Sequence, residues 1–454
     1  MEPARGLRQH DPDFDRSPAR SPILLDPYFQ EYQRLLSNPF LALAALIPWF
    51  AATRLAFLAK HVPMILILLA SLFGIACLLQ YHCLDCGTTG CLFRWKHHVC
   101  DRAIARQLAQ SRRRLIGPNP MTQTVLYPEP LYPDLSVEHE VYGPDVRVVM
   151  GKATKLEELS DQDCAEADAL MILRLHVPGA QLKRFKKLKA VCRMGVGYDR
   201  IDRPASAAQG ITVLNVPDYG TTEVADHAIS LVLALRRGLL LHNEVQRKPD
   251  PAWRYVDTPL VQRLSEQRFG IIGMGRIGTA VALRAKAFGF KVTIFDPHLP
   301  NGGELAVGVA RAPTVEDLLR QSDVLSIHAP LTTETRGFLD SQRLSLLPKG
   351  AVVVNTARGP IIDIDALCTL LKNGHLAGVG LDVVPVEPPV EPLPELVRAF
   401  RAREPWCEGR LIVTPHSAFH SPHAWADIRR KGAETMRAFL LGPRPQNVIS
   451  PEMM

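Results

Sequence analysis

The sequence predicts an α/β protein, and two observations support this prediction. From Met121 onward, short runs rich in β-branched residues alternate with helix-like stretches, which is typical of parallel sheets covered by helices. The expected strands include ALMIL, AVCRMGVG, ITVLNV, FGIIGMG, KVTIFD, DVLSIH, AVVVNT, AGVGLDV and LIVTPH. A glycine-rich turn follows one of them and opens a helix. We therefore expect a doubly wound architecture, in which ligands bind at the carboxyl ends of the strands.

Composition separates the first 120 residues from the rest of the 454-residue chain. The net charge is +7, and residues 1–120 hold 14 Lys and Arg against 8 Asp and Glu. The remainder is close to neutral, which argues against a broad nucleic-acid-binding face. Residues 1–39 are rich in proline and charge, and we expect them to be disordered.

A membrane attachment is predicted for residues 40–81. The stretch from Val62 to Gln80 contains no charged residue and is long enough to cross a bilayer, whereas Arg54 and Pro48 interrupt the run before it. One or two transmembrane helices are both compatible with this pattern, and a buried core helix is the alternative. The basic segment 82–120 should stay on the cytoplasmic side. If residues 1–120 were a gene-model extension, the protein would instead be cytoplasmic.

The segment 82–120 also contains possible metal ligands. Cys83 and Cys86 form one pair, and His97 and Cys100 form a second, with the ligand types and spacing of a small zinc site. Such a site could have a zinc- or redox-sensing role. A set of reduced thiols near the membrane is an equally acceptable interpretation.

The glycine turn predicts a dinucleotide site. Gly273, Gly275 and Gly278 follow the strand RFGII and open the next helix, where they would permit a tight turn, the approach of a pyrophosphate and close helix–strand packing. The helix N-terminus favours phosphate. Asp296 ends the second strand, where a carboxylate would accept hydrogen bonds from a ribose diol and repel a 2′-phosphate, so NAD is favoured over NADP. Alone, Asp296 could simply start a turn.

Three further strands lead into residues suited to acid–base chemistry. Arg358 follows AVVVNTA, Glu387 follows AGVGLDVVPV, and His416 ends RLIVTPH. An arginine suits a carboxylate and a carbonyl oxygen, and a histidine oriented by a glutamate can transfer a proton near neutral pH. Each residue alone could be structural. Together, behind a dinucleotide motif, they predict the reduction of a 2-oxo acid.

The motifs RMGVGYDRID, VPDYGTTEVADHAI, FGIIGMGRIG, HAPLTTETRGFL, VNTARGPIID, GLDVVPVEP and TPHSA make the segment from about 121 to 450 resemble the D-isomer-specific 2-hydroxyacid dehydrogenase family, with features of its C-terminal-binding protein branch. The resemblance implies two Rossmann-like domains. An NAD-binding domain (220–416) would be inserted into a split, flavodoxin-like substrate domain (121–219 and 417–454). It also implies a homodimer formed through the NAD-binding domain, with a long helix from Thr221 to Leu241 as a major contact.

The resemblance also implies residue roles. Arg358, Glu387 and His416 would be catalytic, Asp382 would meet the nicotinamide carboxamide, and the loop Met194–Gly197 would offer N–H groups to the substrate carboxylate. Phe419 stands where the C-terminal-binding proteins have tryptophan, which leaves the substrate side chain open. We expect cofactor contacts from Gly273, Gly275, Arg276, Ile277, Gly278, Asp296, Pro330, Thr356 and Asp382, and substrate contacts from Val196, Gly197 and Phe419.

The sequence therefore predicts an NAD-dependent enzyme that reduces 2-oxo acids to D-2-hydroxy acids at the cytoplasmic face of a membrane. The alternative is an NAD(H)-sensing scaffold with little turnover, since the corepressors of this family keep the same three residues.

Overall fold

The computed structural model describes residues 80–82, 89–91 and 123–450, and the chain divides into two compact units, residues 1–118 and 119–454. In the first unit, β1 (Gln80–His82) pairs antiparallel with β2 (Thr89–Cys91). The last two residues of the expected membrane segment therefore lie in a strand. The rest of that segment, the expected disordered region 1–39 and the four expected zinc ligands lie outside the described residues.

None of the helices in the described part of the chain has both the length and the apolar character needed to cross a membrane. The same part of the chain holds no group of three or more His, Cys, Asp or Glu residues arranged to bind a metal ion.

The second unit begins with a lobe built on a five-stranded parallel sheet, which we call the first lobe. The sheet order is β4-β3-β5-β6-β7, the 2-1-3-4-5 order of flavodoxin-like folds. Its strands are β3 (Gln123–Tyr127), β4 (Val146–Met150), β5 (Ala169–Ile172), β6 (Ala190–Arg193) and β7 (Thr212–Asn215).

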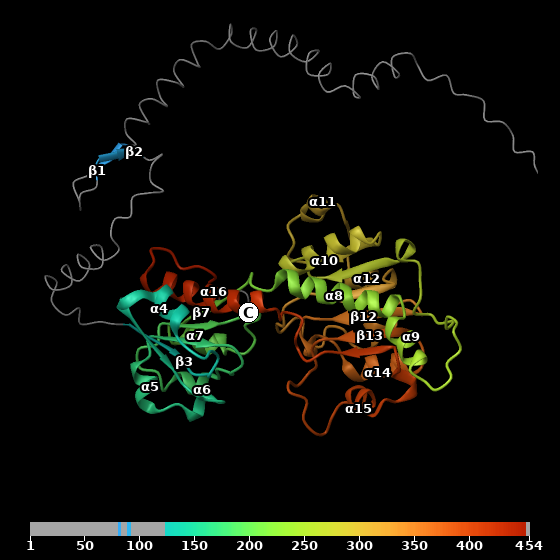
Figure 1. Ribbon diagram of the computed structural model, residues 1–454, viewed down its shortest axis with the longest axis horizontal. Helices are drawn as coiled ribbons and strands as arrows, with labels where there is room; N and C mark the ends of the chain where they lie inside the picture. Colours follow the sequence, from blue (N-terminus) through green and yellow to red (C-terminus); the bar gives the residue numbers. More distant parts are fainter. Residues whose placement is uncertain (1–79, 83–88, 92–122, 451–454) are drawn as a thin grey trace, which may run out of the picture. The chain divides into compact units, whose positions relative to one another are not determined.

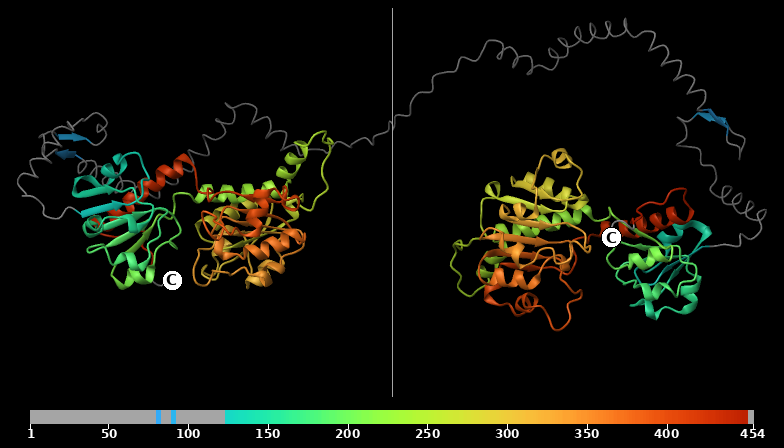
Figure 2. Two further views of the ribbon diagram at one scale, coloured as in Figure 1. Left: turned by 90° about the horizontal axis from the view of Figure 1, so that it is seen from below. Right: turned by 180° about the vertical axis from the view of Figure 1, so that it is seen from behind.

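Helices cover both faces of the first lobe's sheet. They are α4 (Ser136–Tyr142), α5 (Asp161–Glu166), α6 (Gly179–Leu182), α7 (Arg203–Ala208) and, from the end of the chain, α16 (Pro422–Leu441). Side chains alternate between the faces: Val125 and Tyr127 pack in one core with residues of α16, while Leu126 packs in the other. Both views in Figure 2 show α16, in red, beside this lobe. The first lobe is therefore built from two separate stretches of the chain.

The second lobe contains a seven-stranded parallel sheet in the order β10-β9-β8-β11-β12-β13-β14. This 3-2-1-4-5-6 order with one added strand is that of a Rossmann-type dinucleotide fold. Its strands are β8 (Arg268–Ile272), β9 (Lys291–Phe295), β10 (Ala310–Arg311), β11 (Val324–Ile327), β12 (Ala351–Asn355), β13 (Leu376–Leu381) and β14 (Leu411–Val413).

The helices of the second lobe form a layer on each side of its sheet (Figure 1). One core contains side chains of α8 (Thr221–Arg236) and α10 (Arg276–Ala287), and the other contains side chains of α12 (Val315–Arg320), α14 (Ile364–Lys372) and α15 (Glu395–Ala402). The remaining helices are α9 (Leu239–Gln246), α11 (Gly303–Val307) and α13 (Ser341–Ser345). Two linkers, residues 216–220 and 414–421, join the lobes.

The single helix expected from Thr221 to Leu241 is wrong. Gly238 has φ of 59°, in the left-handed region, so α8 ends at Arg236 and α9 starts anew at Leu239. The apolar pattern runs through the break, which is why periodicity alone predicted one continuous helix.

Candidate active site

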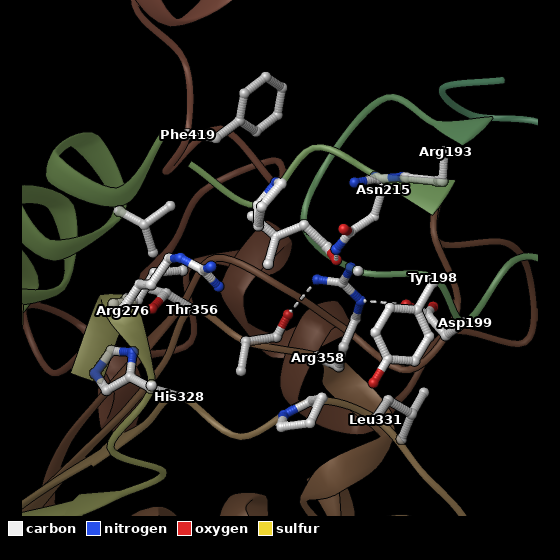
Figure 3. A pocket seen from close by; sticks show the side chains of 18 of the residues that line it. Arg193, Tyr198, Asp199, Asn215, Arg276, His328, Leu331, Thr356, Arg358 and Phe419 are labelled. Atoms are coloured by element: carbon white, nitrogen blue, oxygen red, sulfur yellow. Dashed lines mark hydrogen bonds and ion pairs between the residues drawn. The ribbon is translucent and has the colours of Figure 1, made fainter. Parts of the chain in front are cut away.

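A pocket of about 430 Å³ opens where the carboxyl ends of the two sheets meet (Figure 3). Its lining includes residues that follow β6 and β7 of the first lobe and β8, β11, β12, β13 and β14 of the second. Because parallel strands have their carboxyl ends at the same edge of a sheet, polar groups from seven separate segments line this pocket.

The glycine turn between β8 and α10 fits a dinucleotide phosphate. Gly273 has φ of 89°, and a side chain at Gly278 would meet the Gly273 carbonyl oxygen at 2.0 Å, so each position requires glycine. A side chain at Gly275 would enter open space, and no side chain caps α10. The N–H groups at the start of α10 are therefore available to an anion.

Two other polar groups of the second lobe fit the rest of a dinucleotide. Asp296 directly follows β9 and accepts hydrogen bonds from the N–H groups of Met274 (2.7 Å) and His298 (2.8 Å), so its carboxylate is tied to the glycine turn. The hydroxyl of Thr356 is buried in the pocket wall and has no hydrogen-bond partner among the described residues. A bound ligand would satisfy this hydroxyl, because orphaned buried polar groups are rare.

The expected acid–base pair is formed. His416 Nδ1 lies 2.5 Å from Glu387 Oε2, and both side chains are about one-quarter exposed. Burial acts to raise the pKa of Glu387, but the hydrogen bond and charge of His416 outweigh it, so the pKa lies below its ordinary value. Glu387 is thus ionised at neutral pH and lies behind the imidazole, which itself lines the pocket.

The turn that carries His416 is strained and is held by Asp382. His416 has φ of 52°, which is uncommon for a residue other than glycine and typical of functional sites. The Asp382 carboxylate is 1% exposed and accepts hydrogen bonds from Thr414 Oγ1 (2.6 Å), Ser417 N (2.9 Å) and Ala418 N (3.0 Å). Asp382 lines the pocket, yet these bonds also make it the support of the His416 turn.

Arg358 lies across the pocket floor at the junction of the lobes. Its Nε donates to Asp199 Oδ1 (2.9 Å), and its Nη1 donates to the Ala357 carbonyl (2.7 Å). Nη2 has no acceptor among the described residues. Burial acts to raise the pKa of Asp199, but the charge and hydrogen bond of Arg358 prevail, and the pKa is lowered. One edge of the guanidinium is therefore fixed while the other remains available.

Arg193 is a pocket residue that the sequence analysis missed. It ends β6 and is 9% exposed, and its Nε has no hydrogen-bond partner among the described residues. Burial lowers its pKa, and the like charge of Arg358 adds to this effect. The signal in the sequence was the same as for Arg358, an arginine directly after the apolar run AVC. A buried guanidinium without a carboxylate partner favours an anionic ligand.

His328 is a second pocket residue that was missed. It follows β11, and its Nε2 lies 2.8 Å from Ser326 Oγ. Burial lowers the pKa of this imidazole to about 3. His328 is therefore neutral at neutral pH and adds no charge beside the glycine turn.

The predicted site residues that the structure describes fall into two groups. The pocket is lined by Val196, Gly197, Gly275, Arg276, Ile277, Pro330, Thr356, Arg358, Asp382, His416 and Phe419. Four predicted residues do not line the pocket directly. Gly273 and Gly278 shape the glycine turn, Asp296 follows β9, and Glu387 supports His416. Phe419 packs edge-on against Tyr219, with ring centroids 5.8 Å apart. The structure therefore brings together all the predicted site residues that it describes, and their individual roles remain predictions.

A Rossmann-type lobe whose glycine turn shares a pocket with an arginine and a histidine–glutamate pair defines a dinucleotide-dependent oxidoreductase. Residues 229–418 match the family profile described as D-isomer specific 2-hydroxyacid dehydrogenase, NAD binding domain. The glycerate dehydrogenase of Methylorubrum extorquens is 34% identical over 292 residues, which are 62% of this chain and 85% of the relative. The chain therefore belongs to the D-isomer specific 2-hydroxyacid dehydrogenase family.

Other relatives and solved structures agree with this assignment. D-3-phosphoglycerate dehydrogenase of Bacillus subtilis is 35% identical over 57% of this chain and 46% of its own length. The structure of Aquifex aeolicus D-lactate dehydrogenase with NAD and lactic acid is 26% identical, with a TM-score of 0.61 over 70% of this chain and 96% of that one. A Sinorhizobium meliloti NADPH-dependent glyoxylate/hydroxypyruvate reductase is 27% identical, with a TM-score of 0.62 over 73% and 97%.

Asp296→Ala should relax the preference for NADH over NADPH. The change removes the carboxylate that would bind the ribose diol and repel a 2′-phosphate, so we expect the ratio of kcat/KM values to move towards NADPH by about tenfold or more. Steady-state kinetics with both coenzymes measure this ratio. An unchanged ratio would leave Asp296 only its structural hydrogen bonds to Met274 and His298.

Glu387→Gln should lower kcat for 2-oxo acid reduction. The change removes the negative charge beside His416 and replaces a charge-assisted hydrogen bond with a neutral one, so we expect kcat to fall by about tenfold or more. The measurement is kcat for both proteins, with NADH affinity as the control, which should stay within about twofold. An unchanged kcat would contradict this role for Glu387.

Proposed function

We propose that this protein reduces a small 2-oxo acid to the D-2-hydroxy acid with NADH. The observation that carries the proposal is that His416, backed by Glu387, and Arg358 line the same pocket as the glycine turn. When bound, the nicotinamide supplies a hydride to C2 of the substrate. The start of α10, Thr356 and Asp296 are the groups that would hold the dinucleotide.

The first lobe supplies groups for the substrate carboxylate. Among the described residues, the N–H groups of Val196 and Gly197 have no hydrogen-bond partner, and Arg193 lies buried beside them without a carboxylate partner. Asn215 Nδ2 donates to the Val196 carbonyl (2.7 Å) and holds this loop in place. Backbone donors on a fixed loop beside a desolvated guanidinium make a site for one carboxylate.

The second lobe supplies the polarising and proton-transfer groups. The free Nη2 edge of Arg358 can donate to the substrate carbonyl and to a carboxylate oxygen, which stabilises negative charge as it develops on the C2 oxygen. His416 Nε2 can then protonate that oxygen, because Nδ1 is held by Glu387. In the reverse direction the same imidazole would accept the proton.

The direct test is NADH oxidation with glyoxylate, pyruvate, hydroxypyruvate and branched, methylthio and aromatic 2-oxo acids, using the wild type and His416→Ala. We expect turnover of at least one class, with kcat in the ~1–10³ s⁻¹ range. His416→Ala should lower kcat by roughly 10²- to 10⁴-fold while NADH affinity stays within about twofold. Binding of NADH with negligible wild-type turnover of every acid would favour the sensing scaffold instead.

We also infer a homodimer formed through the second lobe. Leu239 at the start of α9 is 57% exposed, and Trp253 and Tyr255 in the following loop are 92% and 84% exposed. This loop projects from the lobe in Figure 1. Large aromatic side chains at this exposure are typical of surfaces that bind another protein.

Replacing Trp253 and Tyr255 with Ser should convert the dimer to a monomer, because the change removes the aromatic anchors of the contact. Light scattering coupled to size-exclusion chromatography measures the mass of the full chain. Leu305→Ser, a change at a similarly exposed apolar residue on α11, is the matched control and should leave the dimer intact. A wild type that is monomeric at micromolar concentration would contradict the inference.

The proposed location is the cytoplasmic face of a membrane. The uncharged stretch from Val62 to Gln80 and the basic residues after it support this location.

A further inference from the structure

Among the described residues, one ion pair joins the two lobes inside the pocket, and the acid–base chemistry does not account for it. Asp199 lies in the loop after β6 of the first lobe, and Arg358 follows β12 of the second. Their side chains are 24% and 19% exposed and meet at 2.9 Å (Figure 3). Such a partly buried, charge-assisted hydrogen bond is stronger than a surface ion pair.

The pair determines which donors of Arg358 are left for a ligand. A guanidinium has five N–H donors in a rigid, planar fork. Asp199 takes the Nε donor and the Ala357 carbonyl takes one Nη1 donor. Because the fork is planar, holding these two points also fixes the direction of the Nη2 edge. Without Asp199, the guanidinium could rotate about its side-chain bonds.

The loop that carries Asp199 is shaped to receive the same arginine. A side chain at Gly197 would lie 1.6 Å from Arg358 Nη2, so the guanidinium rests against the bare Cα of that glycine. Gly197 and Asp199 thus hold Arg358 from one short segment of the first lobe. Arg358, by contrast, belongs to the second lobe, so its placement depends on the lobes being together.

We propose that Asp199 is the positioning residue for Arg358 and holds the guanidinium fork towards the substrate carbonyl when the two lobes are closed. The proposal rests on the proposed function, because it assigns Arg358 to a 2-oxo acid. Asp199 does not contact the substrate in this arrangement; it acts only through the arginine.

The sign of the expected effect separates this role from simple substrate binding. Asp199→Asn removes a negative charge near the bound carboxylate, so KM for the 2-oxo acid should stay the same or fall. The amide oxygen of Asn can still accept from Arg358, but without the negative charge it should hold the fork less firmly, so we expect kcat to fall by roughly 10- to 100-fold, the size of a charge-assisted hydrogen bond. The measurement is kcat and KM of the full chain with its best 2-oxo acid. An unchanged kcat, or a loss confined to KM, would overturn the proposal.

Two further variants control for damage to the loop. Asp199→Glu keeps the carboxylate and should recover part of the lost kcat. Asp202→Asn removes a nearby carboxylate that caps α7 and bonds Ala205 N (3.0 Å), without contact to Arg358. It should change thermal stability but not kcat. If Asp202→Asn lowers kcat as much as Asp199→Asn, the effect belongs to the loop and the proposal fails.

Chemical labelling of Arg358 tests the role of Asp199 without an activity measurement. Phenylglyoxal reacts with accessible guanidinium groups, and peptide mass spectrometry gives the labelling rate of Arg358 alone. In Asp199→Asn this rate should rise several-fold, with the rate at Arg268 unchanged because Arg268 keeps its own partner, Asp323. Equal labelling of Arg358 in wild type and Asp199→Asn would overturn the proposal, whether or not the wild type reduces a 2-oxo acid. Absent turnover alone would count only against the proposed function.

Discussion

The buried carboxylate of Asp382 supports much of the site. Its three hydrogen bonds hold residues 414–418, and the backbone N–H of His416 also donates to the Asp382 carbonyl at 2.7 Å. This segment carries the imidazole and continues into the linker that returns to the first lobe. One desolvated anion, satisfied by hydrogen bonds, therefore fixes both the direction of the His416 imidazole and one of the two connections between the lobes. The left-handed backbone of His416 is tolerated because these contacts define it.

The two parallel sheets explain why the remaining groups converge. Arg193 ends one strand and Thr356 and His416 follow two others, yet each lies at the carboxyl end of its sheet. Neither lobe forms a complete site alone. The second lobe provides the glycine turn, the histidine and Arg358, whereas the first provides Arg193, the free N–H groups and Asp199. A reaction between a cofactor held by one lobe and an acid held by the other, as proposed, would therefore require both lobes to be in contact.

Much of this arrangement could be predicted from the sequence, because it follows local rules. Strand–turn–helix spacing indicated the glycine turn. Because parallel strands have their carboxyl ends at one edge of the sheet, Arg358 and His416 could be placed at that edge. Arg193 was missed although it shows the same pattern as Arg358. The Asp199–Arg358 bond joins residues 159 positions apart and depends on the packing of two lobes, which periodicity cannot reveal. The break at Gly238 was missed because the apolar pattern continues across it. For the ion pair the missing information was the packing of the two lobes, and for the helix break it was a single backbone angle.

The charged groups around the proposed substrate site limit the number of negative charges that a bound ligand can carry. Asp199 neutralises Arg358, and Glu387 neutralises His416 when the imidazole carries the proton needed for reduction. Among the described residues of the first lobe that line the pocket, Arg193 is then the charged group without a carboxylate partner, and burial lowers its pKa. One carboxylate would balance it, whereas a second anionic group on the substrate would leave a net negative charge in a desolvated space, which is unfavourable. If the pocket binds a 2-oxo acid as proposed, this charge balance predicts a preference for an uncharged side chain, and Phe419 and Tyr219, which line the pocket, are the residues expected to contact it.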